Sequence, residues 1–134
     1  MSSDSIQVLV RSRLEQADDA LNAARILLEQ HSLRAAVNRA YYAMFYAVLA
    51  LLALYRQETS KHSGAISLFD REFVKPGVFS KELSQALHRA FRQRLTADYT
   101  PLRTVSDEEA QQVFDEARAF VARVKEHLAQ EPNP

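Results

Sequence analysis

Apolar side chains recur at steps of three and four residues along most of the chain, which is the spacing of one face of an α-helix. This pattern predicts five helices joined by short loops. In chain order they run from Asp4 to Gln30, from Ser32 to Arg56, from Thr59 or Ser60 to Pro76-Gly77, from Ser80 to Pro101, and from Ser106 to about Gln130. Short loops between long helices favour antiparallel neighbours, so we expect an all-α antiparallel bundle of about five helices, in a single domain over residues 1–134.

Polar residues at the expected helix starts support these boundaries. The residues placed to accept a hydrogen bond from the first free N–H groups of their helices are Ser32, Thr59 or Ser60, and Ser80. Ser106 and Glu109 have the spacing of a capping box, in which each residue satisfies a backbone N–H group near the other. This capping box predicts the start of the last helix.

The second predicted helix is apolar on most of its faces, which indicates a central position in the bundle. No charged residue occurs from Ala40 to Tyr55, a run of 16 residues that contains four tyrosines. A membrane span needs about 18–20 residues of this kind, so the run fits the buried core helix of a soluble domain better. Its aromatic residues are expected to pack in the core, and its surplus of apolar surface allows one side to contact a second copy of the chain.

The composition narrows the possible functions. The chain has 17 basic and 17 acidic side chains, so no net charge attracts nucleic acid or anionic lipid, and only a local basic patch could do so. Cysteine is absent, which excludes disulfides, thiolate metal sites and a cysteine nucleophile. This absence, and a first segment MSSDSIQ without the basic and apolar stretches of a signal peptide, favour a cytoplasmic location.

Arg94 in the fourth predicted helix departs most clearly from the pattern of a plain bundle. At about 100° per residue, Arg94 falls within about 60° of the apolar residues of its helix, and Asp98 lies at about 40° from it. Arg89 and Arg92 fall outside this stripe and are expected to face solvent. A guanidinium on an apolar stripe needs a partner. Two hypotheses stay open: a structural ion pair with Asp98, and an arginine held ready for a phosphate.

Two other polar features stand out. Asn38 aligns with Phe45 and Leu52 on the inward arc of the second helix, and a buried amide must find partners, which predicts a hydrogen bond between helices. Lys61 and His62 stand at the start of the third helix, where a cation and the first free N–H groups could favour an anion. A packed histidine in a capping loop is the simpler interpretation of this segment.

Motifs for a metal or a dinucleotide are missing from the sequence. The histidines show no ligand spacing with one another, and the acidic residues form no Glu-x-x-His pairs of the di-iron kind. The chain has no glycine-rich phosphate loop, no G-x-S-x-G elbow and no H-E-x-x-H motif. We therefore expect neither a bound metal nor a cofactor.

Three segments taken together carry a family resemblance. They are Asn38–Ala47 (NRAYYAMFYA), the loop 60–64 (SKHSG) and the pattern Arg94-x-x-Ala97-Asp98-Tyr99. In this order, and over about residues 10–128, the chain resembles the small stand-alone HEPN proteins (higher eukaryotes and prokaryotes nucleotide-binding). The resemblance implies an all-α bundle that is usually a homodimer. It also implies pairing with a minimal nucleotidyltransferase protein in prokaryotic toxin–antitoxin modules.

Many members of that family are metal-independent ribonucleases, and their motif is an arginine followed, after four to six residues, by a histidine. The arginine contacts the scissile phosphate, and the histidine manages protons for attack by the RNA 2′-hydroxyl. By this match Arg94 is the phosphate-binding residue, with Asn38 and Lys61 as further nucleotide- or RNA-binding residues. Two such motifs meet across the family's dimer.

The sequence departs from the motif after Arg94. Tyr99 stands where the histidine could fall, and a tyrosine with its ordinary pKa near 10 is a poor base at neutral pH. His62 could supply the proton relay instead if its loop folds beside Arg94. The candidate catalytic residues are therefore Arg94, Asp98, Tyr99 and His62.

Three functions stay open on this basis. The first is a toxin-like ribonuclease acting through Arg94, and the second is a non-catalytic HEPN module that binds a nucleotide, RNA or a nucleotidyltransferase partner. The third is a structural helical adaptor. The missing histidine weakens the first, and the unusual place of Arg94 weakens the third. We favour a HEPN component of a toxin–antitoxin module.

Overall fold

Five α-helices and one short π-helix account for 86% of the residues that the computed structural model describes, which are 3–57, 59, 61–99 and 104–130. The side chains of residues 97–99 lie outside this description. In chain order the elements are α1 (Ser3–Glu29), α2 (Leu33–Leu54), α3 (His62–Phe69), the π-helix η1 (Asp70–Val74), α4 (Lys81–Tyr99) and α5 (Asp107–Gln130). The predicted all-α bundle is confirmed.

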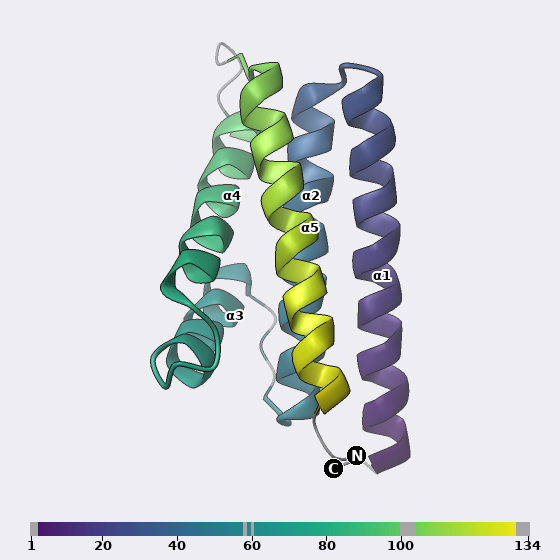
Figure 1. The fold of residues 1–134 in the computed structure, drawn as a ribbon, viewed down its shortest axis with the longest axis vertical. Helices are drawn as coiled ribbons and strands as arrows, with labels where there is room; N and C mark the ends of the chain where they lie inside the picture. The colour runs from purple at the N-terminus through teal and green to yellow at the C-terminus, as the bar shows by residue number, and fades with distance from the viewer. Residues whose placement is uncertain (1–2, 58, 60, 100–103, 131–134) are drawn as a thin grey trace.

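Helix α2 lies at the centre of the bundle. It packs against α1, α3, α4 and α5, and Figure 1 shows α1, α2 and α5 running side by side with α4 along their flank. Helix α1 begins and α5 ends at the same end of the bundle. Met44, Val48 and Leu51 of α2 are completely buried. The central position predicted for this helix is therefore confirmed.

By length and composition alone, α2 could also cross a membrane. In the bundle, however, 61% of its most apolar 18-residue window is buried inside the protein. A single helix of this kind is weak evidence for a membrane span, because the core helix of a soluble protein passes the same test. Its burial fits the core helix of a small soluble domain.

The predicted starts of α4 and α5 are confirmed by their hydrogen bonds. The Ser80 hydroxyl accepts a hydrogen bond from the backbone N–H of Leu83, with an N–O distance of 3.1 Å. The Ser106 hydroxyl accepts one from the N–H of Glu109 at 3.0 Å. These contacts satisfy N–H groups that have no partner within their own helix. The break predicted at Pro101 lies outside the described residues.

Helix α2 starts where it was predicted but without the predicted capping hydrogen bond, and the start of α3 differs from the prediction. Ser32 occupies the capping position of α2, but its side chain makes no capping hydrogen bond. Helix α3 is capped at Lys61, not at Thr59 or Ser60. The Thr59 hydroxyl instead accepts a hydrogen bond from the N–H of Lys61 at 3.3 Å, a local turn that delays the helix until His62. Ser60 itself lies outside the described residues.

Helices α1 and α2 are each followed by a residue in the left-handed region of backbone conformation. His31 has φ 57° and Arg56 has φ 60°. After α1, the N–H of Ser32 donates to the carbonyl of Leu27 at 2.8 Å, and α2 ends with the same pattern. This is the Schellman arrangement, in which glycine is the usual left-handed residue.

Helix α3 continues into η1, a change of helix type that the apolar pattern did not predict. The carboxylate of Asp70, the first residue of η1, accepts a hydrogen bond from the Ser84 hydroxyl at 2.6 Å. Its other oxygen lies 2.6 Å from Nε2 of His88. Asp70 therefore joins η1 to α4. The chain then turns at Gly77, whose φ of 89° favours glycine.

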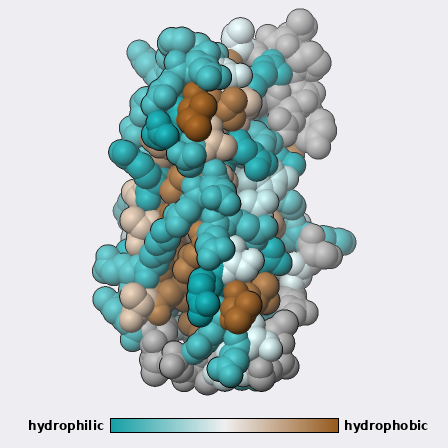
Figure 2. All heavy atoms as spheres, turned by 90° about the vertical axis from the view of Figure 1, so that its right-hand side faces the viewer, coloured by the Kyte–Doolittle hydropathy of each residue, from teal (hydrophilic) through white to brown (hydrophobic). Residues whose placement is uncertain are grey.

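The outer face of the bundle is mixed in character. Figure 2 shows the α1 side as mostly hydrophilic, with separate hydrophobic patches. On α1, Val8 is 59% exposed and Ile26 is 39% exposed. Scattered apolar residues of this kind are normal on a protein surface.

Arginines on the outer side of α4 differ in their surroundings. Arg92 is exposed, as predicted. Arg89 is only partly exposed because it forms an ion pair with Glu116 of α5. The prediction that Arg89 faces solvent is therefore correct only in part, since the side chain also links two helices. Sequence spacing within α4 contains no information about this partner on α5.

Candidate functional site

Four aromatic rings, those of Tyr41, Tyr42, Phe45 and Phe91, gather where α2 meets α4, and Tyr41 lies at their centre. Successive residues of a helix point about 100° apart, so Tyr41 is fully buried while its neighbour Tyr42 is half-buried. The centroid of the Tyr41 ring lies 6.0 Å from that of Phe45 and 5.6 Å from that of Phe91 on α4. We call these four residues the aromatic cluster.

His62, the first residue of α3, packs directly on this cluster. Its ring is parallel to that of Phe45, with an interplanar angle of 6° and centroids 4.1 Å apart. Its Nδ1 lies 2.7 Å from the hydroxyl oxygen of Tyr41. Burial lowers the pKa of His62, and the positive charge of Arg94 lowers it further. His62 therefore favours its neutral form.

Arg94 reaches the same cluster from α4. Its guanidinium carbon lies 5.6 Å from the ring centroid of Tyr41 and 5.5 Å from that of Tyr42, within the range of cation–π attraction. Its Nη2 donates a long hydrogen bond of 3.4 Å to the hydroxyl of Tyr42. Burial raises the pKa of Tyr41, and the nearby charge of Arg94 only partly offsets this effect. Arg94 thus lies partly buried on an apolar stripe, as its sequence position predicts.

Asn38 is connected to the site through Arg39. The side-chain oxygen of Asn38 accepts hydrogen bonds from Nε and Nη2 of Arg39 at 3.2 and 3.1 Å. The guanidinium of Arg39 in turn lies 4.8 Å from the ring centroid of Tyr42. The half-buried Tyr42 ring therefore lies within cation–π distance of two arginines, Arg39 and Arg94.

The other predicted site residues fall into two groups. Lys61 is exposed and directly precedes His62, so its charge lies at the edge of the site. The side chains of Asp98 and Tyr99 lie outside the described residues, and so does the predicted ion pair of Arg94 with Asp98. The described structure thus brings together Arg94 and His62, with Asn38 one step away.

Sequence reasoning missed the roles of Tyr41, Tyr42 and Arg39. The interpretation of the two tyrosines as core packing is correct for Tyr41 but incomplete for Tyr42. Adjacent residues of this central helix are often both buried, as Met44 and Phe45 are, so the sequence contained no signal that Tyr42 reaches the surface. Arg39 gave no signal of its own, since an arginine near the start of an apolar helix usually faces solvent.

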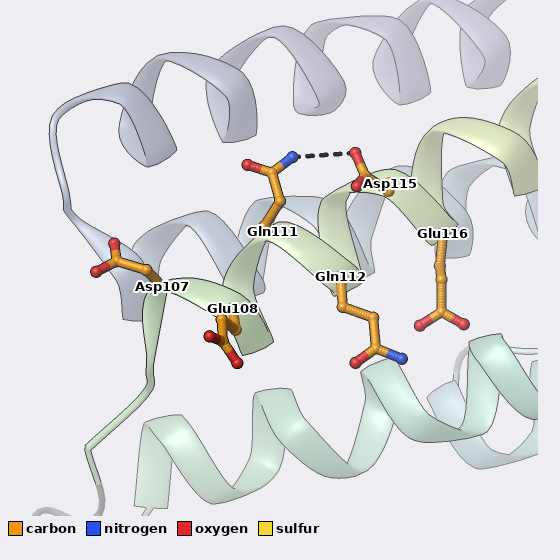
Figure 3. A pocket seen from close by; sticks show the side chains of 6 residues that line it. All are labelled: Asp107, Glu108, Gln111, Gln112, Asp115 and Glu116. Atoms are coloured by element: carbon orange, nitrogen blue, oxygen red, sulfur yellow. Dashed lines mark hydrogen bonds between the residues drawn. The ribbon is translucent and has the colours of Figure 1, made fainter.

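A hollow on the α5 surface has a different character. Figure 3 shows that its lining comes from α5 alone, with the side chain of Gln111 turned toward Asp115. Gln111 donates a hydrogen bond to the Asp115 carboxylate at 3.0 Å. The lining residues are Asp107, Glu108, Gln111, Gln112, Asp115 and Glu116. Four carboxylates disfavour a phosphate ligand, so we place the candidate site at the aromatic cluster.

The polar groups around the aromatic cluster are guanidinium, phenol and imidazole. These groups recognise phosphates and nucleobases by hydrogen bonding and stacking. Within the described part of the chain, no group of three or more histidine, cysteine, aspartate or glutamate side chains is arranged to hold a metal ion.

The sequence is similar to a known domain family and to several relatives. Residues 10–127 match the family model of the HEPN domain. A UPF0332 protein of Thermotoga maritima is 40% identical over 110 residues, covering 82% of this chain and 83% of the relative. A Methanocaldococcus jannaschii protein named "Putative toxin MJ0605" is 36% identical over 119 residues, covering 89% and 88% of the two chains.

A solved structure supports the same fold. The crystal structure of the protein TT1696 from Thermus thermophilus superposes with a TM-score of 0.74, covering 87% of this chain and 96% of that one. At 22% sequence identity, this likeness concerns the fold alone. The family model and the relatives also show the family, because their similarity to this chain extends over most of its sequence. The chain therefore belongs to the HEPN family.

Proposed function

We propose that this protein is the HEPN component of a prokaryotic toxin–antitoxin module, in the cytoplasm, and that it binds and cleaves RNA through Arg94. The observation that carries the proposal is the position of the Arg94 guanidinium, over the rings of Tyr41 and Tyr42. A guanidinium has a permanent charge and planar donors that suit a phosphate. The toxin names of two Methanocaldococcus jannaschii relatives support the module.

The groups around Arg94 suit a short stretch of single-stranded RNA. The ring of Tyr42 on α2 is partly exposed, and exposed rings are surfaces on which bases stack. Arg39, over the Tyr42 ring, and Lys61, next to His62 in the sequence, add positive charge. Because the chain has no net charge, and acidic residues line the α5 hollow, RNA contact would be confined to this side of the bundle.

The proposed reaction needs no metal ion. The RNA 2′-hydroxyl attacks the neighbouring phosphorus, a new oxygen–phosphorus bond forms, and the bond to the 5′-oxygen breaks. Arg94 stabilises the negative charge that accumulates on the phosphate oxygens. The hydroxyl proton passes to a base, and the leaving oxygen gains a proton. Asp98 and Tyr99, close behind Arg94 in the sequence, remain the candidates for this proton transfer, and a homodimer would bring a second site near the first.

Cleavage assays with purified variants test this proposal. Wild type, Arg94→Ala, Arg94→Lys and Arg92→Ala would be incubated with end-labelled single-stranded RNA in the presence of EDTA. We expect wild type and Arg92→Ala to cleave, and both Arg94 variants to lose cleavage while keeping their melting temperature within a few degrees. Arg92 is the matched control because it is an exposed arginine of the same helix. Normal cleavage by Arg94→Lys would overturn the role of the planar guanidinium.

A non-catalytic HEPN module is the second candidate. It is favoured by Tyr99, which stands where the family's histidine could fall. It is also favoured by the lowered pKa of His62, because little of the protonated ring is then present at neutral pH to act as an acid. In this case the wild type would bind RNA, a nucleotide or a nucleotidyltransferase partner without cleaving RNA. Co-expression with the product of a neighbouring nucleotidyltransferase gene, followed by size-exclusion chromatography, would reveal a stable complex.

A further inference from the structure

The hydroxyl of Tyr41 is enclosed in the core and has one hydrogen-bond partner in the described part of the chain. Tyr41 is 0% exposed, and its ring packs against Phe45 and Phe91. Its oxygen lies 2.7 Å from Nδ1 of His62. Among the described residues no other hydrogen bond reaches this hydroxyl. The phenol of Tyr41 can therefore form its hydrogen bond only with Nδ1 of His62 among the described residues.

The direction of this hydrogen bond follows from the donors available. A phenol has a single proton to donate, and a buried hydroxyl that donates to no acceptor is costly. If Nδ1 of His62 carried the ring proton, it would donate to Tyr41, and the phenol proton would have no acceptor. If Nδ1 carries a lone pair, the phenol donates to it and both groups are satisfied. The second arrangement places the ring proton of a neutral His62 on Nε2.

The electrostatics of the site agree with this arrangement. Burial raises the pKa of Tyr41, so its phenol keeps the proton that it donates. Burial and the charge of Arg94 lower the pKa of His62, so its ring is neutral and carries one proton only. Stacking on Phe45 holds the ring plane, with an angle of 6° between the two rings. The ring can therefore be held in one orientation and one tautomer.

We propose that Tyr41 is a positioning residue that fixes His62 as the Nε2–H tautomer, and that His62 thereby donates a hydrogen bond to an RNA phosphate oxygen beside Arg94. This role rests on the proposed function. In this tautomer Nε2 has no lone pair to accept the proton of a 2′-hydroxyl. Proton transfer through the ring to Tyr41 is also blocked, because the phenol oxygen already carries its own proton. His62 is thus a phosphate contact and not the general base.

The tautomer can be measured without RNA. Long-range ¹H–¹⁵N correlation spectra of the full chain, with labelled histidine and with His62 assigned by its loss in a His62→Gln variant, distinguish a protonated ring nitrogen from a bare one. At neutral pH we expect Nδ1 of His62 to be bare and Nε2 to be protonated. In Tyr41→Phe, which keeps the ring but removes the donor, we expect a mixture of tautomers. A wild-type spectrum with the proton on Nδ1 would overturn the proposal.

The donor role is tested by two amide substitutions. The amide nitrogen of glutamine can take the place of Nε2, whereas asparagine is too short to reach it. We expect His62→Gln to keep RNA binding within about threefold of wild type, and His62→Asn to weaken it by on the order of tenfold or more. Equal losses in the two variants would contradict the donor role. If the wild type binds no RNA, the proposed function and the phosphate role both fail, while the tautomer measurement still decides what Tyr41 does.

Discussion

Gly64 and Thr59 approach so closely that a Cβ atom on Gly64 would lie 2.6 Å from the Thr59 hydroxyl oxygen. Gly64 is the third residue of α3, where alanine would normally favour the helix by about 1 kcal/mol. Here we expect Gly64→Ala to destabilise the protein, because the hydroxyl must move and give up its hydrogen bond to the N–H of Lys61. Urea unfolding would measure the loss, which we expect to be about 1 kcal/mol.

The double variant Thr59→Ala/Gly64→Ala is the control for this clash. Removing the Thr59 hydroxyl removes the atom that a new Cβ would meet, and the next atom of the side chain lies at 3.5 Å, an ordinary contact. The double variant should therefore be more stable than Thr59→Ala alone, because alanine has a higher helix propensity than glycine. A stabilising effect of Gly64→Ala in both backgrounds would contradict the close approach of these two residues.

The stacking of His62 on Phe45 predicts a separate effect on the site. Phe45→Leu keeps an apolar side chain but removes the flat surface under the imidazole, so we expect an unfolding free energy lower by about 1–2 kcal/mol and weaker RNA binding. Phe114→Leu on α5 is the matched control, because Phe114 is 7% exposed and Phe45 is 8% exposed. The control should lose stability but keep RNA binding. Equal RNA binding in both variants would argue against a role for the stack.

The fold could be predicted from the sequence because helix periodicity and capping are local properties. Ser80 and Ser106 cap their helices as their positions predict. The π-helix η1 was missed because Asp70 finds its partners on α4, 14 and 18 residues away in the sequence. The end of α2 was predicted within two residues, at Arg56, but the left-handed conformation of Arg56 was not, since a left-handed residue other than glycine has no compositional signal.

The candidate site was predictable where a residue broke the pattern of its helix. Arg94 stood on an apolar stripe, and the structure surrounds it with aromatic rings. Tyr41 and Tyr42 did not break any pattern, because aromatic residues on a core helix normally pack against other helices. Their relation to His62 depends on how α3 packs against α2, a tertiary contact that spacing along the chain cannot specify.

The pKa of His62 predicts a dependence of stability on pH. Burial and Arg94 lower this pKa in the folded protein below the ordinary value of 6.5, which the unfolded chain keeps. Between the two values the unfolded state binds more protons, so stability rises with pH there, levels off above about 6.5, and is lost as pH falls. Urea unfolding between about pH 5 and 7 should show a steeper slope for wild type than for His62→Gln. Identical slopes would contradict the lowered pKa, since the other histidines contribute equally to both proteins.

We predict that the protein forms a homodimer through α2 and α4. Tyr46 and Leu49 form a partly exposed stripe on α2, three residues apart, and Phe91 of α4 is partly exposed as well. Packing this stripe against a second copy would remove apolar surface from water, which is the main driving force of association. By the family resemblance, such a dimer would also bring two Arg94 side chains toward one another, as the proposed cleavage requires.

Sedimentation equilibrium at tens of micromolar, an order-of-magnitude concentration for a specific interface, would test this association. We expect a mass twice that of the 15.2 kDa chain for wild type. Tyr46→Glu places a charge on the stripe and should weaken the dimer by on the order of tenfold or more, because a buried unpaired carboxylate opposes association. Val8→Glu is the control, since Val8 lies on α1 and is 59% exposed, and it should remain dimeric. A wild type that sediments as a monomer would refute the homodimer, and a dimer broken by Val8→Glu but not by Tyr46→Glu would move the interface to α1.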